Sequence, residues 1–227
     1  MFSLPVLAAL AVVAVVTSFI SGIFGMAGGM LLIGFLLMIL PVPVAMVFHG
    51  VIQIAANGWR SWLWRHHINW SVVVEFGLGS GFSLLVFSSM AFVPPKWAVL
   101  MAVGLTPFIA LSVPMSLAPN IERRGHAFLA GAIGGALQLV SGVTGPILDV
   151  FYVRTGMTRQ MNVSTKAAAQ VMGHLTKVTY FGALVANPGG RDLEQCPHLI
   201  LVACHAQRLD LIWSPPPRRL ARYRPRR

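Results

Sequence analysis

The chain has 227 residues, of which 56% are hydrophobic and only 10% charged, and its formal net charge is +11 at pH 7. Because soluble domains carry about 25% charged residues, this composition excludes an ordinary soluble domain and indicates a protein that crosses a membrane several times. Basic residues between apolar segments are typical of the positive-inside rule rather than of nucleic-acid binding. We therefore expect a multi-pass protein of the cell (inner) membrane, in contact with the lipid bilayer and without a nucleic-acid partner.

Apolar segments follow one another along the chain and predict an all-α transmembrane helical bundle. They cover residues 4–24, 26–40, 44–62, 70–93, 97–118, 127–153 and 161–186. The first lacks the basic start of a secretory signal, so we interpret it as a retained helix. The second would be only about 22 Å long as a helix, shorter than a hydrocarbon core of ~30 Å, and two prolines end it. Whether it crosses the membrane or re-enters is open at this point.

Two basic loops predict the topology. Arg60 and Arg65 lie in one loop, and Arg123 and Arg124 lie in another. Two expected spans separate these loops, so they lie on one side of the membrane, and the positive-inside rule makes that side cytoplasmic. Four tryptophans between residues 59 and 70 are typical of an interfacial aromatic belt.

An internal repeat connects the two halves of the chain. SGIFG at residues 21–25 recurs as SGVTG at 141–145, and each copy precedes a set of polar residues with spacings of 4, 4 and 3. At 100° per residue, such spacing places each set in one narrow stripe of a helix, within about 80°. Polar groups inside a span usually face the bundle interior or a water-filled path. The first stripe is His49, Gln53, Asn57 and Arg60, and the second is Lys166, Gln170, His174 and Lys177.

Each stripe residue also has a structural interpretation. Arg60 and Lys177 lie near expected helix ends, where long side chains reach the interface. The glutamines and Asn57 can join neighbouring helices, and the histidines can be satisfied core residues. Lys166 can pair with Asp149. We favour a functional interpretation because independent packing contacts would not repeat the spacing.

The stripes carry hydrogen-bond donors and positive charge but no carboxylate, which favours a small anion. Glycine-rich breaks also let backbone N–H groups approach an anion closely. We predict that all eight stripe residues bind the substrate and that Asp149 serves as an ion pair or in coupling. The predicted backbone contacts come from Gly25, Gly28, Gly29, Gly142 and Gly145.

Two longer stretches resemble a known family. SGIFGMAGGMLLIGFLL resembles the first-repeat glycine signature of the TauE/SafE sulfite exporter family, and GVTGPILDVFYVRTGMTRQMNVSTKAAAQ resembles its second-repeat signature. The resemblance covers about residues 5–186. It implies a membrane carrier of two four-helix repeats that moves sulfite, organosulfonates or related small sulfur oxyanions.

Other classes of activity find little support. Only Glu75, Glu122 and Asp149 are acids before residue 190, and no nucleophile motif accompanies them, so we expect no enzyme. Cys196 and Cys204 have histidines nearby, but their spacing matches no usual zinc pattern. We therefore expect neither a metal nor a cofactor.

The last part of the chain departs from the repeat. We expect residues 1–118 to form the first transmembrane repeat, 119–190 a partial and truncated second repeat, and 191–227 a basic, Pro/Arg-rich tail. We interpret the tail as the product of a frameshift near Gly190, with a lipid-binding cytoplasmic tail as the alternative. An inactive remnant or a non-transporting membrane scaffold is then the alternative function. A homodimer that completes the path is also open.

Overall fold

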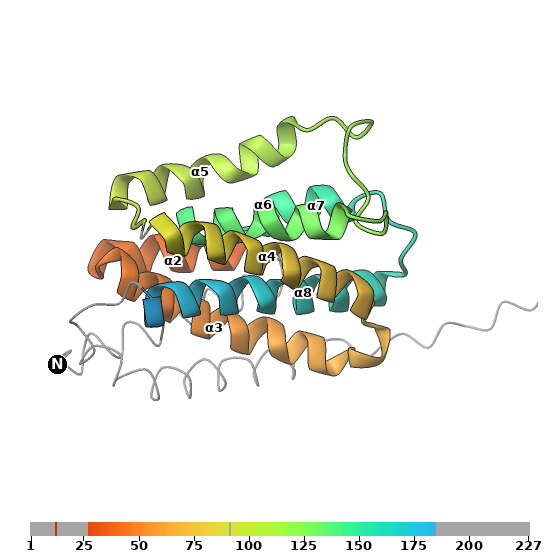
Figure 1. The fold of residues 1–227 in the computed structure, drawn as a ribbon, viewed down its shortest axis with the longest axis horizontal. Helices are drawn as coiled ribbons and strands as arrows, with labels where there is room; N and C mark the ends of the chain where they lie inside the picture. The colour runs from red at the N-terminus through yellow and green to blue at the C-terminus, as the bar shows by residue number, and fades with distance from the viewer. Residues whose placement is uncertain (1–11, 13–26, 91, 185–227) are drawn as a thin grey trace, which may run out of the picture.

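The described part of the chain, residue 12, residues 27–90 and residues 92–184 of a computed structural model, is an all-α bundle (Figure 1). The predicted fold class is confirmed. The first expected helix, Gly25 and the tail lie outside the described residues, apart from Val12. In chain order the helices are α2 (Ala27–Ile39), α3 (Val42–Leu63), η1 (Arg65–His67), α4 (Trp70–Met90), α5 (Lys96–Ser112), α6 (His126–Val140), α7 (Gly145–Tyr152), α8 (Arg159–Thr179) and the π-helical turn η2 (Tyr180–Leu184).

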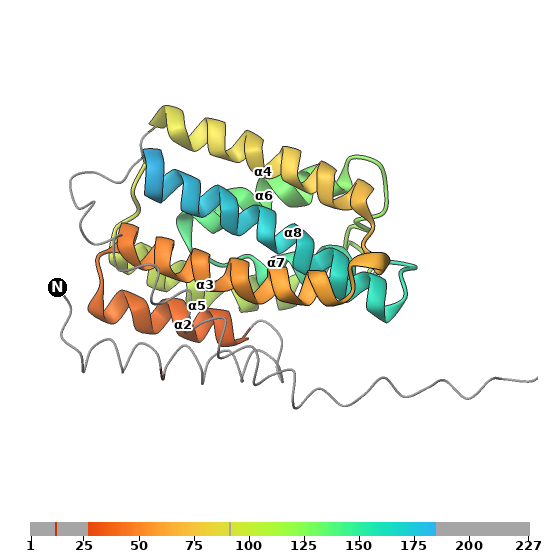
Figure 2. The same ribbon diagram turned by 90° about the horizontal axis from the view of Figure 1, so that it is seen from below.

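Helices α2 and α3 form a hairpin, which we call the first hairpin. Proline lacks a backbone N–H and fixes φ near −65°, so it ends one helix readily and starts the next. Here Pro41 has φ −60° and ψ 151°, which turns the chain from α2 into α3. The 13 residues of α2 span about 20 Å, and the 22 residues of α3 span about 33 Å. Within the described residues, α2 is therefore shorter than α3, which lies beside it (Figure 2).

The expected segment 127–153 is not one helix, and here the sequence prediction is wrong. Helix α6 ends at Val140 and α7 begins at Gly145, with four non-helical residues between them. Gly142 adopts φ +76°, a left-handed conformation that an α-helix cannot contain. Only eight residues, about 12 Å, are left for α7. We call α7 and α8 the second hairpin.

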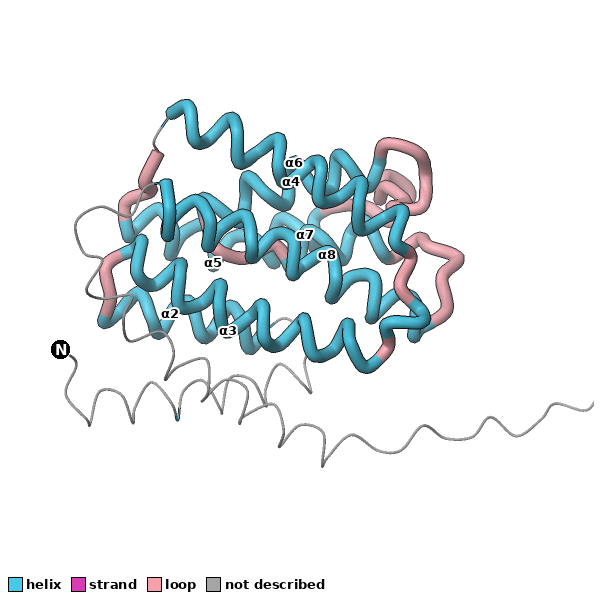
Figure 3. The backbone as a smooth tube through the Cα atoms, turned by 60° about the horizontal axis from the view of Figure 1, so that its bottom comes forward, coloured by secondary structure: helices cyan, strands magenta, loops and turns pink. Residues whose placement is uncertain are grey.

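The two hairpins meet along α3 and α8, which lie side by side and run in opposite directions (Figures 1 and 2). The backbone N–H of Asn69, just after α3, donates to Thr165 Oγ1 near the start of α8 at 2.9 Å. Helix α4 packs against α6 and α8 (Figure 3), while α5 packs against α7 and α2 at the outside of the bundle (Figure 1). Figure 1 places the α3–α4 and α5–α6 connections at one end of the bundle, as the basic loops predict.

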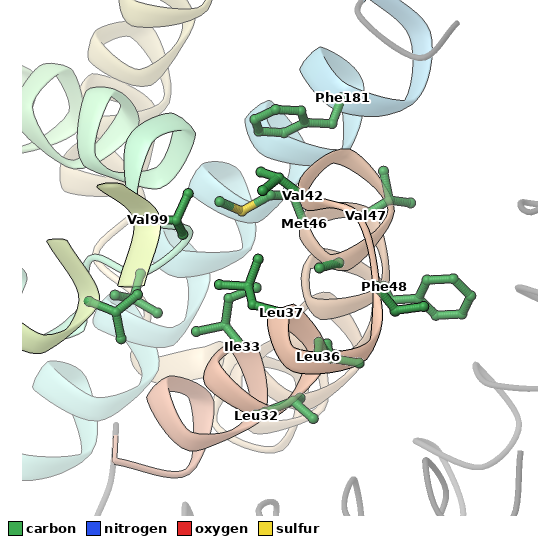
Figure 4. Packing of buried hydrophobic residues seen from close by; sticks show 14 of the residues in the cluster. Leu32, Ile33, Leu36, Leu37, Val42, Met46, Val47, Phe48, Val99 and Phe181 are labelled. Atoms are coloured by element: carbon green, nitrogen blue, oxygen red, sulfur yellow. The ribbon is translucent and has the colours of Figure 1, made fainter. Parts of the chain in front are cut away.

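The larger apolar core fixes the first hairpin in place. Residues of α2 and α3 pack there against Val99 of α5 and Phe181 beyond α8, and all of them are buried (Figure 4). Helices α4 and α6 instead approach through small residues, a typical device of membrane bundles. A methyl group at Gly131 would overlap the carbonyl oxygen of Phe76. Helix α3 is therefore packed against α2, and α8 is packed against α4 and α6.

The outer surface of α4 and α5 is apolar. Leu85 and Leu111 are 72% and 83% exposed, and Phe108 is 68% exposed. Among the described residues, α3 and α4 are long and apolar enough to cross a membrane, while α2, α5 and α6 are shorter apolar helices. A contiguous apolar exterior of this kind suits a lipid environment.

Candidate functional site

A small cavity, partly open to solvent, lies where the two hairpins meet. Both stripes contribute side chains, and both glycine-containing stretches contribute backbone. The lining residues are Gly29 and Met30 of α2; His49, Gln53, Ala56, Asn57 and Arg60 of α3; Val143, Thr144, Gly145 and Pro146 at the start of α7; and Gln170 and His174 of α8.

The stripes meet head to tail because α3 and α8 are antiparallel. The first residue of one stripe therefore lies beside the last residue of the other. His49 Nδ1 lies 2.7 Å from Lys177 Nζ, and Arg60 lies within electrostatic range of Lys166. Inverted pairing of duplicated helices is typical of repeat-built carriers, whose substrate sites lie at the repeat interface.

One buried network joins the two hairpins. Lys177 Nζ donates to His49 Nδ1 and, at 2.9 Å, to the carbonyl oxygen of Gly142. Since Nδ1 of His49 accepts, its ring proton is on Nε2, which donates to the carbonyl oxygen of Gly29 at 2.9 Å. Both side chains are fully buried. Lys177 therefore does not reach the membrane–water interface. Together with His49 it links the carbonyl oxygens of Gly142 and Gly29, two of the glycines that the sequence predicts to contact the anion.

His174 has a different partner. Its Nδ1 accepts a hydrogen bond from the side-chain amide of Gln138, a residue of α6 that is fully buried. The imidazole proton is then on Nε2. The ring lies 5.5 Å from that of His49, centroid to centroid, in an edge-on arrangement. Among the described residues, Gln138 Oε1 is buried without a hydrogen-bond partner.

The break between α6 and α7 is buried, so its backbone needs partners within the protein. Ser141 Oγ lies 2.8 Å from the Leu137 carbonyl oxygen and 2.9 Å from that of Val143. Lys177 satisfies the carbonyl oxygen of Gly142, as described above. The first N–H groups of an α-helix have no partner within the helix, and those of α7 begin at Gly145 on the cavity wall.

The lack of a side chain at Gly29 leaves room for the Gln53 amide in the cavity wall. A methyl group there would overlap Nε2 of Gln53, which lies against the α2 backbone. Asn57, on the next turn, is buried; its Nδ2 donates to the Gln53 carbonyl oxygen at 3.1 Å and its Oδ1 accepts from Arg60 at 3.5 Å. The α3 stripe is thus ordered by contacts along its own helix as well as with α2.

Lys166 forms an ion pair with Asp149 of α7, as the structural interpretation of that residue anticipates. The side chains are 19% and 47% exposed, so solvent reaches the pair. Neither residue is part of the cavity wall. The pair connects α7 to α8 within the second hairpin.

The structure brings together most of the residues that the repeat predicts. Six of the eight stripe side chains line the cavity, as do Gly29 and Gly145. Lys177 lies behind the wall and Lys166 beside it, while Gly28 is buried in α2 and Gly142 lies in the break. The substrate-binding roles of these residues stay predictions.

Sequence reasoning missed Gln138, Thr144 and Met30. Gln138 has no counterpart in the first stripe, so the repeat could not find it. Its one signal is a lone polar residue in an apolar helix, three positions before SGVTG. Within the described ranges, no group of three or more His, Cys, Asp or Glu residues could hold a metal ion.

Comparison with known proteins identifies one family. The family model described as Sulfite exporter TauE/SafE matches residues 10–203, a stretch that contains the cavity and both hairpins. No curated protein and no solved structure matches the chain.

Proposed function

Since the chain belongs to the sulfite exporter TauE/SafE family of membrane transporters, we propose that it carries a small sulfur oxyanion, such as sulfite or an organosulfonate, across the inner membrane. The cavity between α3 and α8 is the proposed binding site. The end of the bundle that carries Arg60, Arg65, Arg123 and Arg124 then faces the cytoplasm.

One observation carries this proposal: the two stripes and the two glycine-containing stretches converge on one cavity whose described wall carries donors but no carboxylate. Anions are bound by arginine, amide and imidazole N–H groups and by backbone N–H groups at helix starts. Arg60, Gln53 and Gln170 supply side chains of these kinds, and α7 starts at the wall. The described wall offers a cation no carboxylate to balance its charge.

Each group has a distinct task in this proposal. Arg60 supplies charge and can bind two oxygens of an oxyanion in one plane. The amides of Gln53 and Gln170 hold the remaining oxygens from opposite hairpins, so a bound anion contacts both. Carriers built from inverted repeats move one repeat against the other around a fixed site. In this proposal, that motion changes the surroundings of a substrate that contacts both hairpins.

Transport into proteoliposomes tests the proposal. The full chain is reconstituted, and uptake of radiolabelled sulfite and methanesulfonate is measured against empty vesicles. Gln53→Ala and Gln170→Ala should each raise KM about tenfold, as expected for loss of one hydrogen bond to a charged group. Gln160→Ala is the matched control, because Gln160 lies exposed on the first turn of α8, away from the cavity wall.

Two outcomes distinguish an error in the proposed function from an error in the proposed binding site. No uptake of either anion by the wild-type chain would contradict the proposed function. Uptake with an unchanged KM in both cavity variants would contradict the proposed site and leave the function standing.

A further inference from the structure

We infer that His174 is a proton-binding group of the carrier, so that the anion moves together with a proton. This inference rests on the proposed function, since it concerns the same cavity. Its basis is the different hydrogen bonding of two neighbouring buried histidines. His49 is held in one tautomer, whereas His174 has a partner that can serve both of its protonation states.

His49 cannot take up a second proton without losing a bond. Its Nε2 donates to the Gly29 carbonyl oxygen at 2.9 Å, and its Nδ1 accepts from Lys177 at 2.7 Å. Protonated Nδ1 would face the donating Lys177 Nζ at that distance, donor against donor. The network therefore keeps His49 neutral while Lys177 stays in place.

His174 meets the side-chain amide of Gln138 instead of the Lys177 nitrogen. Gln138 now donates to Nδ1 through its –NH₂, and the carbonyl oxygen of the same amide is buried without a partner among the described residues. The two ends of an amide have nearly the same shape. A half-turn of the Gln138 amide would present Oε1 to a protonated Nδ1 and give that oxygen the hydrogen bond it lacks. The proton would go onto Nδ1 as the amide turns, and the –NH₂ would take the position that Oε1 occupies now.

The groups around α8 make this protonation depend on the anion. His174 lies beside His49, and Lys177 is bonded to that ring, so its nearest ionisable neighbours are basic. The one acid bonded to α8 within the described chain, Asp149, is paired with Lys166. Charged and titratable residues on the elements packed against α8 are His49 and Arg60 of α3, Arg65, His66 and His67 of η1, Glu75 of α4, His126 of α6, Asp149 and Tyr152 of α7 and Tyr180 of η2; α8 itself adds Arg159, Lys166 and Lys177.

Glu75 and His126 form no hydrogen bond or ion pair with His174, His49 or Lys177 in the described structure. The missing negative charge beside His174 is therefore the charge that an anion in the cavity would bring. Anion and proton would each strengthen the binding of the other, since thermodynamic coupling between two sites is reciprocal. A monovalent anion and one proton would then cross the membrane together without net charge.

Methanesulfonate is the probe that isolates this proton. A sulfonate stays ionised over the working pH range, so any proton that accompanies it is bound by the protein. In proteoliposomes that contain a pH dye, an inward methanesulfonate gradient should acidify the lumen, with about one proton per anion. An inward proton gradient of one pH unit should drive labelled methanesulfonate up to about tenfold above its external concentration, the equilibrium limit for one proton per anion.

Substitution at position 174 should separate transport from coupling. His174→Gln keeps a polar side chain but cannot bind the proton, so the methanesulfonate uptake that it retains, at whatever rate, should no longer acidify the lumen. Accumulation driven by the proton gradient should fall about tenfold. His66→Gln is the matched control, because His66 is exposed in η1 and does not line the cavity. It should behave as the wild type.

A measurement on the wild type needs no variant. Methanesulfonate affinity should rise about tenfold when the pH is lowered, and calorimetry in buffers of different ionisation enthalpy should show proton uptake on binding. Wild-type transport without proton movement, or His174→Gln with full proton-driven accumulation, would overturn the inference and leave the carrier function intact. If the wild type exchanged no methanesulfonate or sulfite at all, the proposed function itself would fail.

Discussion

The first and second hairpins carry the same polar spacing, yet they reach the cavity by different means. In the first, α2 is a regular helix of 13 residues, and it reaches the cavity because Gly29 has no side chain. In the second, α7 has only eight residues, and a buried non-helical segment at residues 141–144 precedes it. The duplicated pattern therefore specifies where the polar groups lie but leaves the local backbone free to differ.

Different interactions stabilise the two hairpins. Four leucine and isoleucine side chains of α2, at positions 32, 33, 36 and 37, are buried in the larger core. The 141–144 segment depends instead on polar partners, namely the Ser141 hydroxyl and the Lys177 ammonium. Buried polar networks are costly when one member is lost. We therefore expect the second hairpin to be the more sensitive to polar substitutions and the first to changes of volume.

The largest expected effect comes from Lys177→Met. Methionine keeps much of the side-chain volume but cannot donate, so the Gly142 carbonyl oxygen and His49 Nδ1 lose their donor. Each of these two buried groups costs about 1–3 kcal/mol when left without a partner, so we expect a loss of roughly 2–6 kcal/mol in the free energy of unfolding. Thermal unfolding in detergent, followed by size-exclusion chromatography, would measure the change.

Lys96→Met is the matched control, because Lys96 is exposed at the start of α5. Its melting temperature should stay near that of the wild type. If Lys177→Met were as stable as Lys96→Met, the second hairpin would not depend on the buried lysine.

A pair of glycine substitutions sharpens the contrast between the hairpins. Gly142→Ala forces a methyl group into φ +76° and places it 2.7 Å from Met46 Sδ, so stability should fall by about 1–2 kcal/mol. Gly29→Ala lies in a regular helix and displaces only the end of the Gln53 side chain. It should leave stability nearly unchanged and raise KM for methanesulfonate several-fold.

Gly34→Ala is the control for both, since an added methyl group at Gly34 meets no neighbour within 4 Å. Unfolding midpoints and transport kinetics of the three variants would be compared. The contrast would be refuted if Gly29→Ala destabilised the protein more than Gly142→Ala did.

The smallest effect is expected at the ion pair of α7 and α8. Because solvent reaches Asp149, the pair should contribute less than about 1 kcal/mol to stability. Asp149→Asn alone should therefore change the unfolding midpoint only slightly. The exchange of both residues, Asp149→Lys with Lys166→Asp, should restore most of any loss. A double-mutant cycle with a coupling energy well above this value would show that the pair matters more than its exposure indicates.

The sequence could predict which residues share a face, but not which faces meet. Helical spacing alone places Gln53 beside Arg60 and Gln170 beside His174 along one helix side. The contact between Lys177 and His49 depends on the antiparallel packing of α3 on α8, which no local pattern encodes. Lys177 also looked like a residue near a helix end. The chain continues helically through η2, and Lys177 is fully buried against α3 and the 141–144 segment.

The break before α7 was predictable in kind but not in extent. SGVTG marks the position of the interruption, and Gly142 supplies its left-handed residue. The apolar run nevertheless continues on both sides, so hydrophobicity alone gives one segment where the structure has two helices. Gln138 stayed hidden for a related reason: a lone glutamine has no periodic partner, and its role depends on His174 across the helix interface.

The central claim is that one anion site is shared by both hairpins, and protection of engineered cysteines tests it most directly. In a background with Cys196→Ser and Cys204→Ser, single Gln53→Cys, Gln170→Cys and Gln160→Cys variants would be alkylated with N-ethylmaleimide at increasing methanesulfonate concentrations. We predict that the anion slows alkylation at positions 53 and 170 with the same half-maximal concentration, and that position 160 is unaffected. Protection at neither cavity position, or at the two positions with clearly different half-maximal concentrations, would contradict a shared site.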